Sequence, residues 1–241
     1  MRVAVLSDIH SNLVALDAVL AHAGTVDAVW HLGDVVGYGP DPDGVVARLI
    51  EVGAIGVRGN HDAAALGGPE IEWFNPEARA AAEWTRDTID RTTRAWLSAL
   101  PERHAIDRMT LVHGSPRDPI REYVSDAGIA LENLAVLETD FGLHGHTHVP
   151  VAFCLGLADR LQVVAPNRGD GIQLDGQRAL INPGSVGQPR DGDPDASYLI
   201  LDPDAATVTW HRVPYDIPAV QAAIRAAGLP RRLADRLAYG A

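Results

Sequence analysis

The sequence predicts an α/β fold in which one domain, residues 1–241, contains two β-sheets. In the first half, short β-branched apolar runs alternate with helical patterns, which is typical of layered α/β proteins with mainly parallel strand pairing. In the second half, short strands are separated by turn residues, which indicates hairpins and a mostly antiparallel sheet. Because 46% of the residues are hydrophobic, the chain can bury a core and is not disordered as a whole.

Five short apolar runs in the first half are predicted strands: Val3–Leu6, Val26–Leu32, Ile55–Val57, Thr110–Val112 and Phe141–Leu143. Apolar residues recur at helical spacing from Leu13, over Val45–Val52 and over Ile129–Leu137. A long helix, in which the pattern allows a break, starts at Pro76 and runs toward Pro101. Proline is tolerated in a first helical turn because the N–H that it lacks would have no partner there.

Six further strands are predicted in the second half: Val151–Leu155, Leu161–Ala165, Gly171–Leu174, Arg178–Ile181, Tyr198–Leu201 and Val208–Arg212. Turn residues such as Gly169 and Asp175 lie between them. The chain then continues into a helix at Pro218–Ala227 and a short arginine-rich helix up to Leu237.

The charge balance excludes several classes of function. Twenty basic residues stand against 32 acidic ones, a net charge of −12. Since the sequence has no local basic stripe, long nucleic acids are not expected as partners. All the basic residues are arginine, which excludes a Schiff-base lysine and a P-loop lysine. Cys154, the only cysteine, cannot form an internal disulfide or a cysteine-based metal cluster.

The sequence gives no sign of membrane association. No apolar run reaches the ~18–20 residues that span a bilayer. The first residues, 1–12, lack the pattern of a secretory signal, so we expect a cytoplasmic protein.

Residues that can bind metals follow five predicted strands. They are Asp8 with His10, then Asp34, then Asn60 with His61, then His113, then His146 with His148. Ligands in open α/β sheets bind beyond the carboxyl ends of the strands, so we expect these side chains at one edge of one sheet. Asp8 and His10 are two residues apart, and so are His146 and His148. Residues two apart in extended backbone point to the same side, so each of these pairs can present two ligands to a common centre.

The candidate ligands offer only nitrogen and oxygen atoms, with several imidazoles and at least two carboxylates. Such a set suits Mn²⁺, Fe²⁺, Co²⁺, Ni²⁺ or Zn²⁺. It suits Mg²⁺ and Ca²⁺ poorly, because these ions prefer shells of oxygen.

The five motifs, taken in order, resemble those of the calcineurin-like metallophosphoesterase family. They are Asp8-Ile9-His10, Gly33-Asp34, Gly59-Asn60-His61-Asp62, His113 and Gly145-His146-Thr147-His148, followed by Asn182-Pro183-Gly184-Ser185. Any one motif is weak alone, but all five in order are specific. The resemblance covers roughly the first 190 residues and implies a two-sheet β-sandwich flanked by helices, with two metal ions at one edge.

The resemblance also implies a role for each matching residue. Asp8, His10 and His148 would hold one divalent metal ion. Asn60, His113 and His146 would hold the other, and Asp34 would bridge them. Two ions held ~3.5–4 Å apart can share a hydroxide that attacks the phosphorus atom. His61 would face the substrate and stabilise or protonate the leaving oxygen.

One motif departs from the family's protein-phosphatase branch. That branch has Asp-Arg three and four residues after the bridging aspartate, where this sequence has Gly37 and Tyr38. The difference argues against a phosphoprotein phosphatase and against the dinucleoside-tetraphosphate hydrolases that share the signature. Asp62 is a weak candidate for orienting His61, because adjacent residues seldom face each other.

Other groups must then bind the phosphate, and two arginines are candidates. Arg190 follows the Asn-Pro-Gly-Ser turn, and Arg117 follows His113 in Gly114-Ser115-Pro116-Arg117. Arginine is suited to such a role because its planar guanidinium binds phosphate in a bidentate manner.

Several other residues are more simply explained by packing or by turns. His22, His31, His104 and His211 have no motif around them, and His144 is expected to pack although it lies near the histidine pair. Trp73 and Phe74 could stack on an aromatic leaving group, but packing under the long helix is the simpler interpretation. Arg168-Gly169-Asp170 is expected to be a turn, and Asp191, Asp193 and Asp195 a solvated loop.

The sequence therefore predicts a metal-dependent phosphoesterase that acts on small phosphomonoesters or phosphodiesters, with nucleotides as one possible class. The alternative is a non-catalytic protein-binding scaffold on the same fold. A scaffold has no reason to keep the full ligand set and His61. The native metal pair and the oligomeric state are left open by the sequence.

Overall fold

The computed structural model describes residues 1–157 and 159–241, which form two six-stranded sheets packed face to face. The strands of the first sheet are β1 (Val3–Leu6), β2 (Ala28–His31), β3 (Ile55–Gly56), β9 (Gly171–Gln173), β11 (Ala196–Asp202) and β12 (Thr207–Val213). Those of the second are β4 (Arg103–Ile106), β5 (Met109–Val112), β6 (Phe141–Leu143), β7 (Val151–Gly156), β8 (Leu161–Val164) and β10 (Gln177–Asn182).

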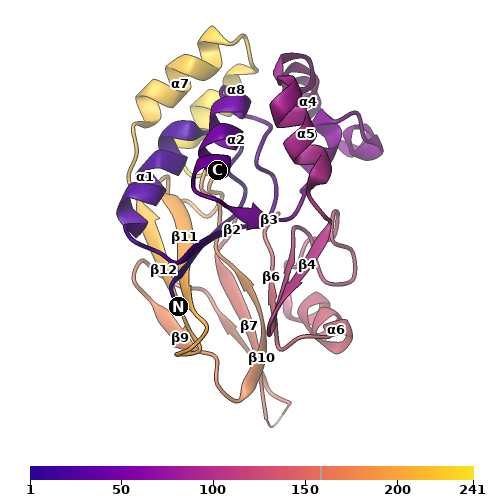
Figure 1. Cartoon of the computed structure of the whole chain (residues 1–241), viewed down its shortest axis with the longest axis vertical. Coiled ribbons are helices and arrows are strands. Elements are labelled where there is room, and N and C mark those ends of the chain that lie inside the picture. Colours follow the sequence, from indigo (N-terminus) through magenta and orange to yellow (C-terminus); the bar gives the residue numbers. More distant parts are fainter. Residues whose placement is uncertain (158) are drawn as a thin grey trace.

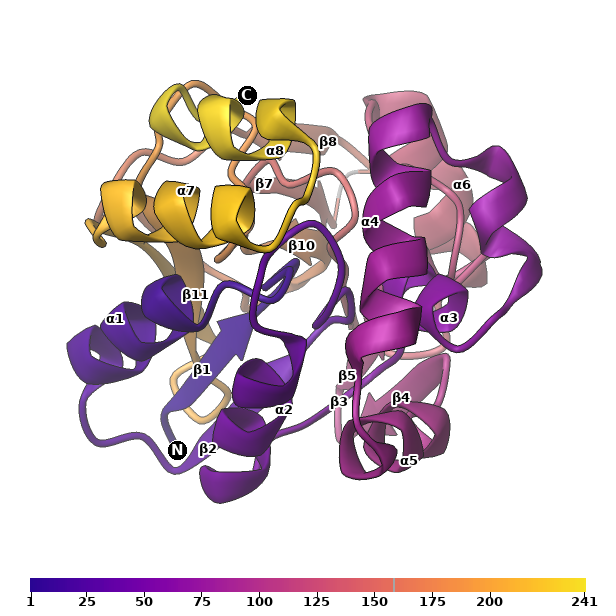
Figure 2. The ribbon, with the colours of Figure 1, turned by 90° about the horizontal axis from the view of Figure 1, so that it is seen from above.

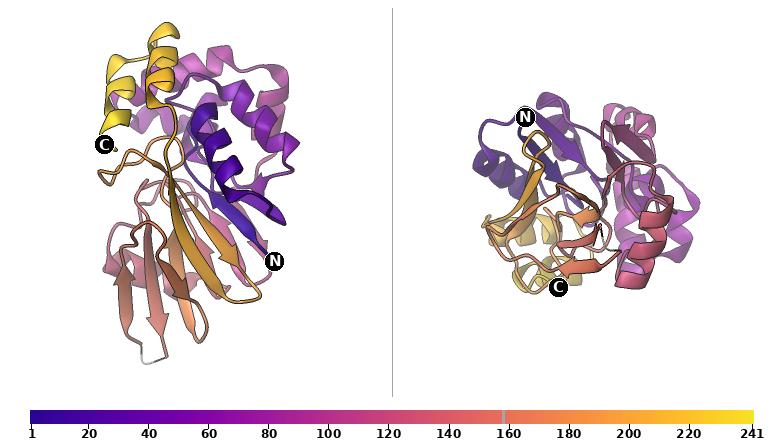
Figure 3. Two further views of the ribbon diagram at one scale, coloured as in Figure 1. Left: turned by 90° about the vertical axis from the view of Figure 1, so that its left-hand side faces the viewer. Right: turned by 90° about the horizontal axis from the view of Figure 1, so that it is seen from below.

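Helices cover the outer faces of both sheets. The helices are α1 (Leu13–Ala23), α2 (Pro42–Glu51), α3 (Asn60–Ala65), α4 (Pro76–Thr88), α5 (Arg91–Ala99), α6 (Ala127–Val136), α7 (Ile217–Ala226) and α8 (Arg231–Asp235), with 3₁₀ turns η1 (Pro69–Trp73) and η2 (Arg236–Ala238). Helices α1 and α2 lie on the first sheet and α6 lies on the second. Most helices gather at one end of the sandwich, and the strands extend toward the other end (Figures 1 and 3). No helix among the described residues is long and apolar enough to cross a membrane.

Strand β1 shows how the layers form. Val3 and Val5 point between the sheets and join the core that includes Trp210, while Ala4 and Leu6 point to the cluster under α1 and α2. This alternation is the two-residue period of a strand that is buried on both faces. Helix α6 covers the second sheet in the same way, with Leu134 packed in one cluster with strand residues of that sheet.

Strands of the first half pair mainly parallel with one another and those of the second half pair antiparallel, as predicted, but the two halves do not form separate sheets. The sheet orders are β3-β2-β1-β11-β12-β9 and β4-β5-β6-β10-β7-β8, so each sheet combines strands from both halves of the chain. Strand β11 pairs antiparallel with β1, and β10 pairs parallel with β6. All the predicted strands are present, but periodicity within a strand does not specify which strand will be its partner.

Local signals also explain where the helices begin. The long helix is divided into α4 and α5 because the Asp90 side chain accepts a hydrogen bond from the backbone of Thr93 and starts a new helix. Asn75 caps α4 in the same manner, with Pro76 in the first turn. Strand β4, helix α3 and turn η1 lie outside the predicted elements.

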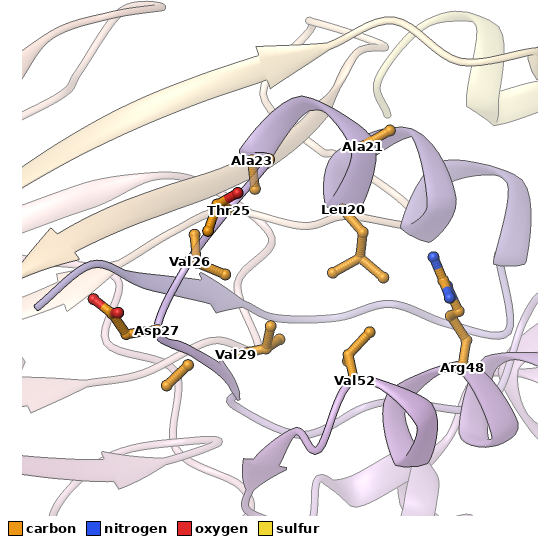
Figure 4. Close-up of a pocket in the computed structure, with 11 residues that line it drawn as sticks. Leu20, Ala21, Ala23, Thr25, Val26, Asp27, Val29, Arg48 and Val52 are labelled. Carbon is orange, nitrogen blue, oxygen red and sulfur yellow. The ribbon is translucent and has the colours of Figure 1, made fainter.

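A cavity of about 370 Å³ lies between α1 and α2. Figure 4 shows the side chains of Leu20, Val29 and Val52 around it, with Arg48 at one side. The Arg48 side chain is held by Asp17 and Glu51. The lining is mainly apolar and includes none of the predicted metal ligands, so this cavity is separate from the chemistry described next.

Candidate metal centre

The predicted ligands meet at the edge where strands of both sheets end. Asp8 and Asp34 follow β1 and β2 of the first sheet, while His113 and His146 follow β5 and β6 of the second. The expectation of one edge of one sheet is therefore wrong, because the sandwich brings two parallel strand groups together at the same end. Figure 2, viewed from that end, shows the helices α1–α2, α3–α5 and α7–α8 as three groups around these loops.

The backbone of the centre is strained. Five of the seven predicted ligands have positive φ angles: Asp8 (53°), His10 (50°), Asp34 (49°), His146 (66°) and His148 (61°). Residues other than glycine adopt this region rarely, and clusters of such residues are found at functional sites where the surroundings enforce them. The expected extended backbone is therefore not observed at these pairs: Asp8 and His10 face one ligand group, whereas His146 and His148 face two neighbouring groups.

Glycines allow the ligand loops to approach one another closely. A Cβ atom on Gly59 would lie 2.1 Å from Oδ1 of Asp34, and one on Gly145 would lie 1.9 Å from Oγ of Ser7. The turn after β10 supports the same loops, because the Ser185 hydroxyl donates to the Asp8 carbonyl at 2.7 Å. Asn182 Nδ2 donates to the Gly145 carbonyl at 2.7 Å.

Four histidines each commit one ring nitrogen to a backbone carbonyl. Nδ1 of His10 lies 3.2 Å from the Val36 oxygen, Nδ1 of His113 lies 2.8 Å from the Leu32 oxygen and Nδ1 of His148 lies 2.6 Å from the Gln188 oxygen. His146 uses Nε2 instead, 3.2 Å from the Arg121 oxygen. Since a carbonyl only accepts, these nitrogens carry the protons, and a neutral ring then directs a lone pair at the centre.

The lone pairs face one another in two groups. Nε2 of His10 lies 3.1 Å from Nε2 of His148, and Nε2 of His113 lies 3.0 Å from Nδ1 of His146. Asn60 completes the second group, with Oδ1 2.9 Å from Nε2 of His113. When neither nitrogen of such a pair carries a proton, the two lone pairs repel each other unless a cation lies between them.

Asp34 belongs to both groups. Its Oδ2 lies 3.7 Å from Nε2 of His10 and 3.3 Å from Nε2 of His113. Asp8 belongs to the first group, with Oδ1 3.3 Å from Nε2 of His148. That Oδ1 atom is buried and has no hydrogen-bond partner among the described residues, as expected for an oxygen meant to bind a cation.

The donor set therefore fits divalent transition metals. Asp8, His10, Asp34 and His148 form one compact group, and Asp34, His113 and His146 form another. All are buried, so a cation would compensate carboxylate charge that water cannot reach. Imidazoles outnumber carboxylates, which favours Mn²⁺, Fe²⁺, Co²⁺, Ni²⁺ or Zn²⁺ over Mg²⁺ and Ca²⁺.

The charges of the centre are strongly coupled to one another. Burial alone would raise the pKa of Asp34, but the imidazoles of His113 and His61 outweigh it and hold this pKa well below its ordinary value. Burial opposes charge on His113, yet Asp34 and Asp8 raise its pKa to about 9. Metal binding must therefore displace a proton, as is usual for metal sites.

His61 lies beside the ligands without joining either group. Its backbone N–H donates to Oδ1 of Asp34 at 2.8 Å. Its ring stacks on Phe74 at a centroid distance of 4.4 Å and contacts Tyr38 at 4.3 Å. Nδ1 is buried without a partner in the described part of the chain. Burial lowers the pKa of His61 to about 4, so the ring is neutral near pH 7.

The structure explains why Gly37 and Tyr38 stand where the protein-phosphatase branch has Asp-Arg. A Cβ atom on Gly37 would lie 2.6 Å from Nδ1 of His61, so glycine leaves room for that ring. Tyr38 packs on both His61 and His10. The Asp62 carboxylate accepts from the backbone of Gly59 at 2.8 Å and of Val36 at 3.0 Å, so it holds the loop rather than orienting His61.

The two candidate phosphate-binding arginines have different surroundings. Arg190 lies 5.7 Å from the Tyr38 ring, its buried Nε has no partner among the described residues, and its charge helps to lower the pKa of His61. Arg117 is held by Glu122 and Glu132 instead. Its guanidinium is already neutralised, and the geometry gives no support for a substrate contact.

Two residues of the centre were missed from the sequence. The Tyr123 ring stacks on His146 at a centroid distance of 3.8 Å, and the Arg121 guanidinium lies 3.7 Å from the centre of the Trp73 ring. Both belong to an irregular loop between β5 and α6, where no periodic pattern or motif signals a function.

The other residues considered in the sequence analysis lie outside the two ligand groups. His144 is buried and belongs to neither metal group, and Arg168-Gly169-Asp170 is part of the loop between β8 and β9. The acidic loop is less solvated than expected, because Asp191 pairs with Arg212 and Asp195 pairs with Arg168.

Comparisons with known proteins agree with this geometry. A family model described as "Calcineurin-like phosphoesterase superfamily domain" matches residues 1–206. The uncharacterized protein MJ0912 of Methanocaldococcus jannaschii is 34% identical, over 99% of this chain and 98% of that protein. Phosphodiesterase YfcE of Escherichia coli K12 is 30% identical, over 86% of this chain and 91% of that protein.

Solved structures share the fold over the full length. The crystal structure of a metallophosphoesterase from Sphaerobacter thermophilus has a TM-score of 0.91 and 46% identity, and covers 100% of both chains. The hypothetical protein PH1004 from Pyrococcus horikoshii has a TM-score of 0.80 at 20% identity, and covers 100% of this chain and 98% of its own. The predicted two-sheet sandwich flanked by helices is confirmed.

Proposed function

The chain belongs to the calcineurin-like phosphoesterase superfamily and is a metal-dependent phosphoesterase; on that premise, we propose that it hydrolyses small phosphomonoesters or phosphodiesters with two divalent transition-metal ions. The observation that carries the proposal is the position of Asp34 Oδ2 between two groups of metal-binding side chains. A net charge of −12 disfavours long nucleic acids as substrates.

The residues divide between the two ions as their distances suggest. Asp8, His10 and His148 would hold one ion, and Asn60, His113 and His146 the other. Asp34 would bridge them. When bound, such a pair lowers the pKa of a shared water and neutralises charge on the phosphoryl oxygens.

His61 is the proposed catalytic residue of the chain itself. A neutral imidazole retains one N–H. Nδ1 is buried against Gly37, so we assign the N–H that meets the substrate to Nε2. Contacts with Phe74 and Tyr38 fix the ring plane. The N–H can therefore donate to the oxygen that leaves phosphorus, at the moment when that oxygen gains negative charge.

Arg190 is the proposed phosphate-binding residue. Its Nη2 donates to Oε1 of Gln188 at 2.9 Å, and the Gln188 carbonyl accepts from His148. The guanidinium is thereby fixed near the metal centre, while its buried Nε stays available for an anion. We do not assign Arg117 to the substrate.

Hydrolysis of p-nitrophenyl phosphate and bis-p-nitrophenyl phosphate tests the proposal. We expect turnover with added Mn²⁺ that excess chelator abolishes, and a matched Asp34→Asn variant that loses turnover. Absence of hydrolysis with any of Mn²⁺, Fe²⁺, Co²⁺, Ni²⁺ or Zn²⁺ would overturn the proposal and favour the scaffold alternative. The complete ligand set gives that alternative no support.

A further inference from the structure

A second cavity, of about 240 Å³, adjoins the metal centre. Two of the proposed ligands line it, Asn60 at the start of α3 and His146 in the loop after β6. The other lining residues are Glu70, Trp73, Phe74, Arg121 and Tyr123. Ligand sites of drug-like molecules usually have ~300–1,000 Å³. The cavity therefore has room for one planar group that is attached to a phosphate at the centre.

The walls of the cavity are flat and partly exposed. Tyr123 stacks on His146 with an interplanar angle of 21° and is 49% exposed. Trp73 is 55% exposed and carries the Arg121 guanidinium 3.7 Å from its ring centre. Packing under the long helix does not account for Trp73, because a packed ring would be buried. Aromatic faces and a guanidinium plane are the surfaces on which planar rings stack.

The cavity also contains a polar side chain whose hydrogen bonding is incomplete. Glu70 is only 8% exposed, and its Oε2 atom has no hydrogen-bond partner among the described residues. A buried acceptor of this kind requires a donor. A purely hydrocarbon ring would leave Glu70 without a donor, whereas a heterocycle with N–H groups would provide one.

We propose that this cavity binds the base of a nucleoside phosphoester, with the base stacked between Tyr123 and the Trp73–Arg121 pair and an N–H group facing Glu70. This inference rests on the proposed function, because the phosphate of the same molecule must reach the metal centre. Arg121 and Tyr123 are then the residues that determine specificity.

Adenosine 5′-monophosphate and ribose 5-phosphate form a suitable pair of substrates. Both release the same 5′ oxygen, so they differ mainly in the base. Each is tested as the monoester and as its methyl diester, with the full chain and Mn²⁺. We expect kcat/KM to be roughly 5- to 150-fold higher for the base-bearing member, as stacking of one base provides. Equal values would overturn the inference.

Two variants test which side chains cause the preference for the substrate that carries a base. Tyr123→Leu removes one flat wall, and Arg121→Gln removes the guanidinium plane; in each, we expect the ratio of the two kcat/KM values to fall toward one. Tyr239→Leu and Arg108→Gln are matched controls. Tyr239 is exposed outside this cavity, and Arg108 lies 5.1 Å from the Phe141 ring where β5 begins, at the other end of that strand. A ratio that falls equally in the controls would contradict the assignment.

Calorimetry separates this inference from the proposed function. Binding of both compounds is measured with Mn²⁺ and with chelator present. If neither compound is hydrolysed but adenosine 5′-monophosphate binds more tightly, and Tyr123→Leu removes the difference, the cavity assignment stands and the catalytic proposal falls. If hydrolysis occurs without any preference for the base in rate or binding, the cavity assignment falls alone.

Discussion

His61 differs from the other buried histidines of the centre in how its nitrogens are used. The proposed ligands each give one ring nitrogen to a backbone carbonyl, which fixes the ring and aims the second nitrogen at a cation. His61 is instead held by aromatic faces, which fix the plane of the ring but use neither nitrogen. Such a side chain can exchange a hydrogen bond with substrate without disturbing the metals.

Replacing His61 by asparagine should therefore separate turnover from metal binding. We expect kcat to fall by roughly 10²- to 10⁴-fold, the usual contribution of a general acid. The metal content of the purified variant, measured by elemental analysis, should equal that of the unchanged protein. His104→Asn, in strand β4 away from the ligand loops, is the control. Loss of metal together with turnover would make His61 a ligand and refute the assigned role.

A second buried histidine should control the pH dependence of stability. The His31 ring lies 5.4 Å from the Trp96 ring, and neither of its nitrogens has a hydrogen-bond partner among the described residues. Burial lowers the pKa of His31 from 6.5 to about 3. Between pH 6.5 and about pH 3, His31 is therefore protonated in the unfolded chain but neutral in the folded chain. The stabilising effect of the neutral ring is complete above pH 6.5 and is lost as the pH falls toward 3.

Urea unfolding of the His31→Leu variant at several pH values measures this effect. Between pH 6 and pH 4, the free energy of unfolding should decline less steeply than in the unchanged protein, by up to about 1.4 kcal/mol per pH unit, the value for one proton. Chelator in all samples keeps metal binding out of the comparison. Parallel curves for the two proteins would show that His31 is protonated equally in both states.

At the scale of elements, the loop between β5 and α6 contributes Arg121 and Tyr123 to the cavity beside the metal centre. Glu122 lies between Arg121 and Tyr123 and receives hydrogen bonds from Ser115, Arg117 and Asn133. Arg117 lowers the pKa of Glu122 to about 2, so the carboxylate stays charged in any ordinary buffer. The network fixes a loop that has no regular hydrogen bonding of its own.

Glu122→Gln should loosen that loop. We expect a loss of stability of about 1–3 kcal/mol, as for a partly buried hydrogen bond to a charged group, and a larger KM for base-bearing substrates than for ribose 5-phosphate. Glu132→Gln is the matched control, because it removes the other partner of Arg117 and leaves Glu122 in place. Thermal unfolding and steady-state kinetics measure both effects. An unchanged KM ratio with reduced stability would limit Glu122 to a structural role.

The same loop shows what the sequence could not predict. Asp8 or His148 could be found because each follows an apolar strand within a short motif, and such local patterns survive in the linear sequence. Arg121 and Tyr123 became visible only when folding placed them beside Trp73 and His146. Contacts between distant loops leave no periodic signal, so this cavity could be found only in the structure.

At the scale of the whole molecule, strands from the first and second halves of the chain pair with one another in both sheets. Because β11 pairs with β1 and β10 with β6, neither sheet can be completed from one half alone. Hydrophobic periodicity predicted the strands and the two-sheet class, but the choice of partner depends on long-range packing that local propensity does not encode. Residues 1–241 as one domain remains a prediction, and a single cooperative unfolding transition is its expected signature.

Metal binding should stabilise the sandwich as a whole, because the ligands come from both sheets. Asp8 and His10 follow β1, His113 follows β5, and Asp34 belongs to both ligand groups. A cation that binds only the folded chain adds about 2.7 kcal/mol per site when its free concentration is 100 times Kd. Titration with Mn²⁺ should therefore raise the thermal midpoint of the chelator-treated protein in proportion to the logarithm of metal concentration.

Asp34→Asn is the decisive variant for this coupling. Replacing the shared carboxylate removes charge from both ligand groups, so we expect the Mn²⁺-dependent rise in thermal midpoint to be largely lost. Glu132→Gln, remote from both groups, should keep the full rise. If Asp34→Asn responds to Mn²⁺ as strongly as the unchanged protein, the cations bind elsewhere and do not join the two sheets. If the variant loses the response, metal binding that depends on Asp34 is coupled to the folding of the two-sheet sandwich.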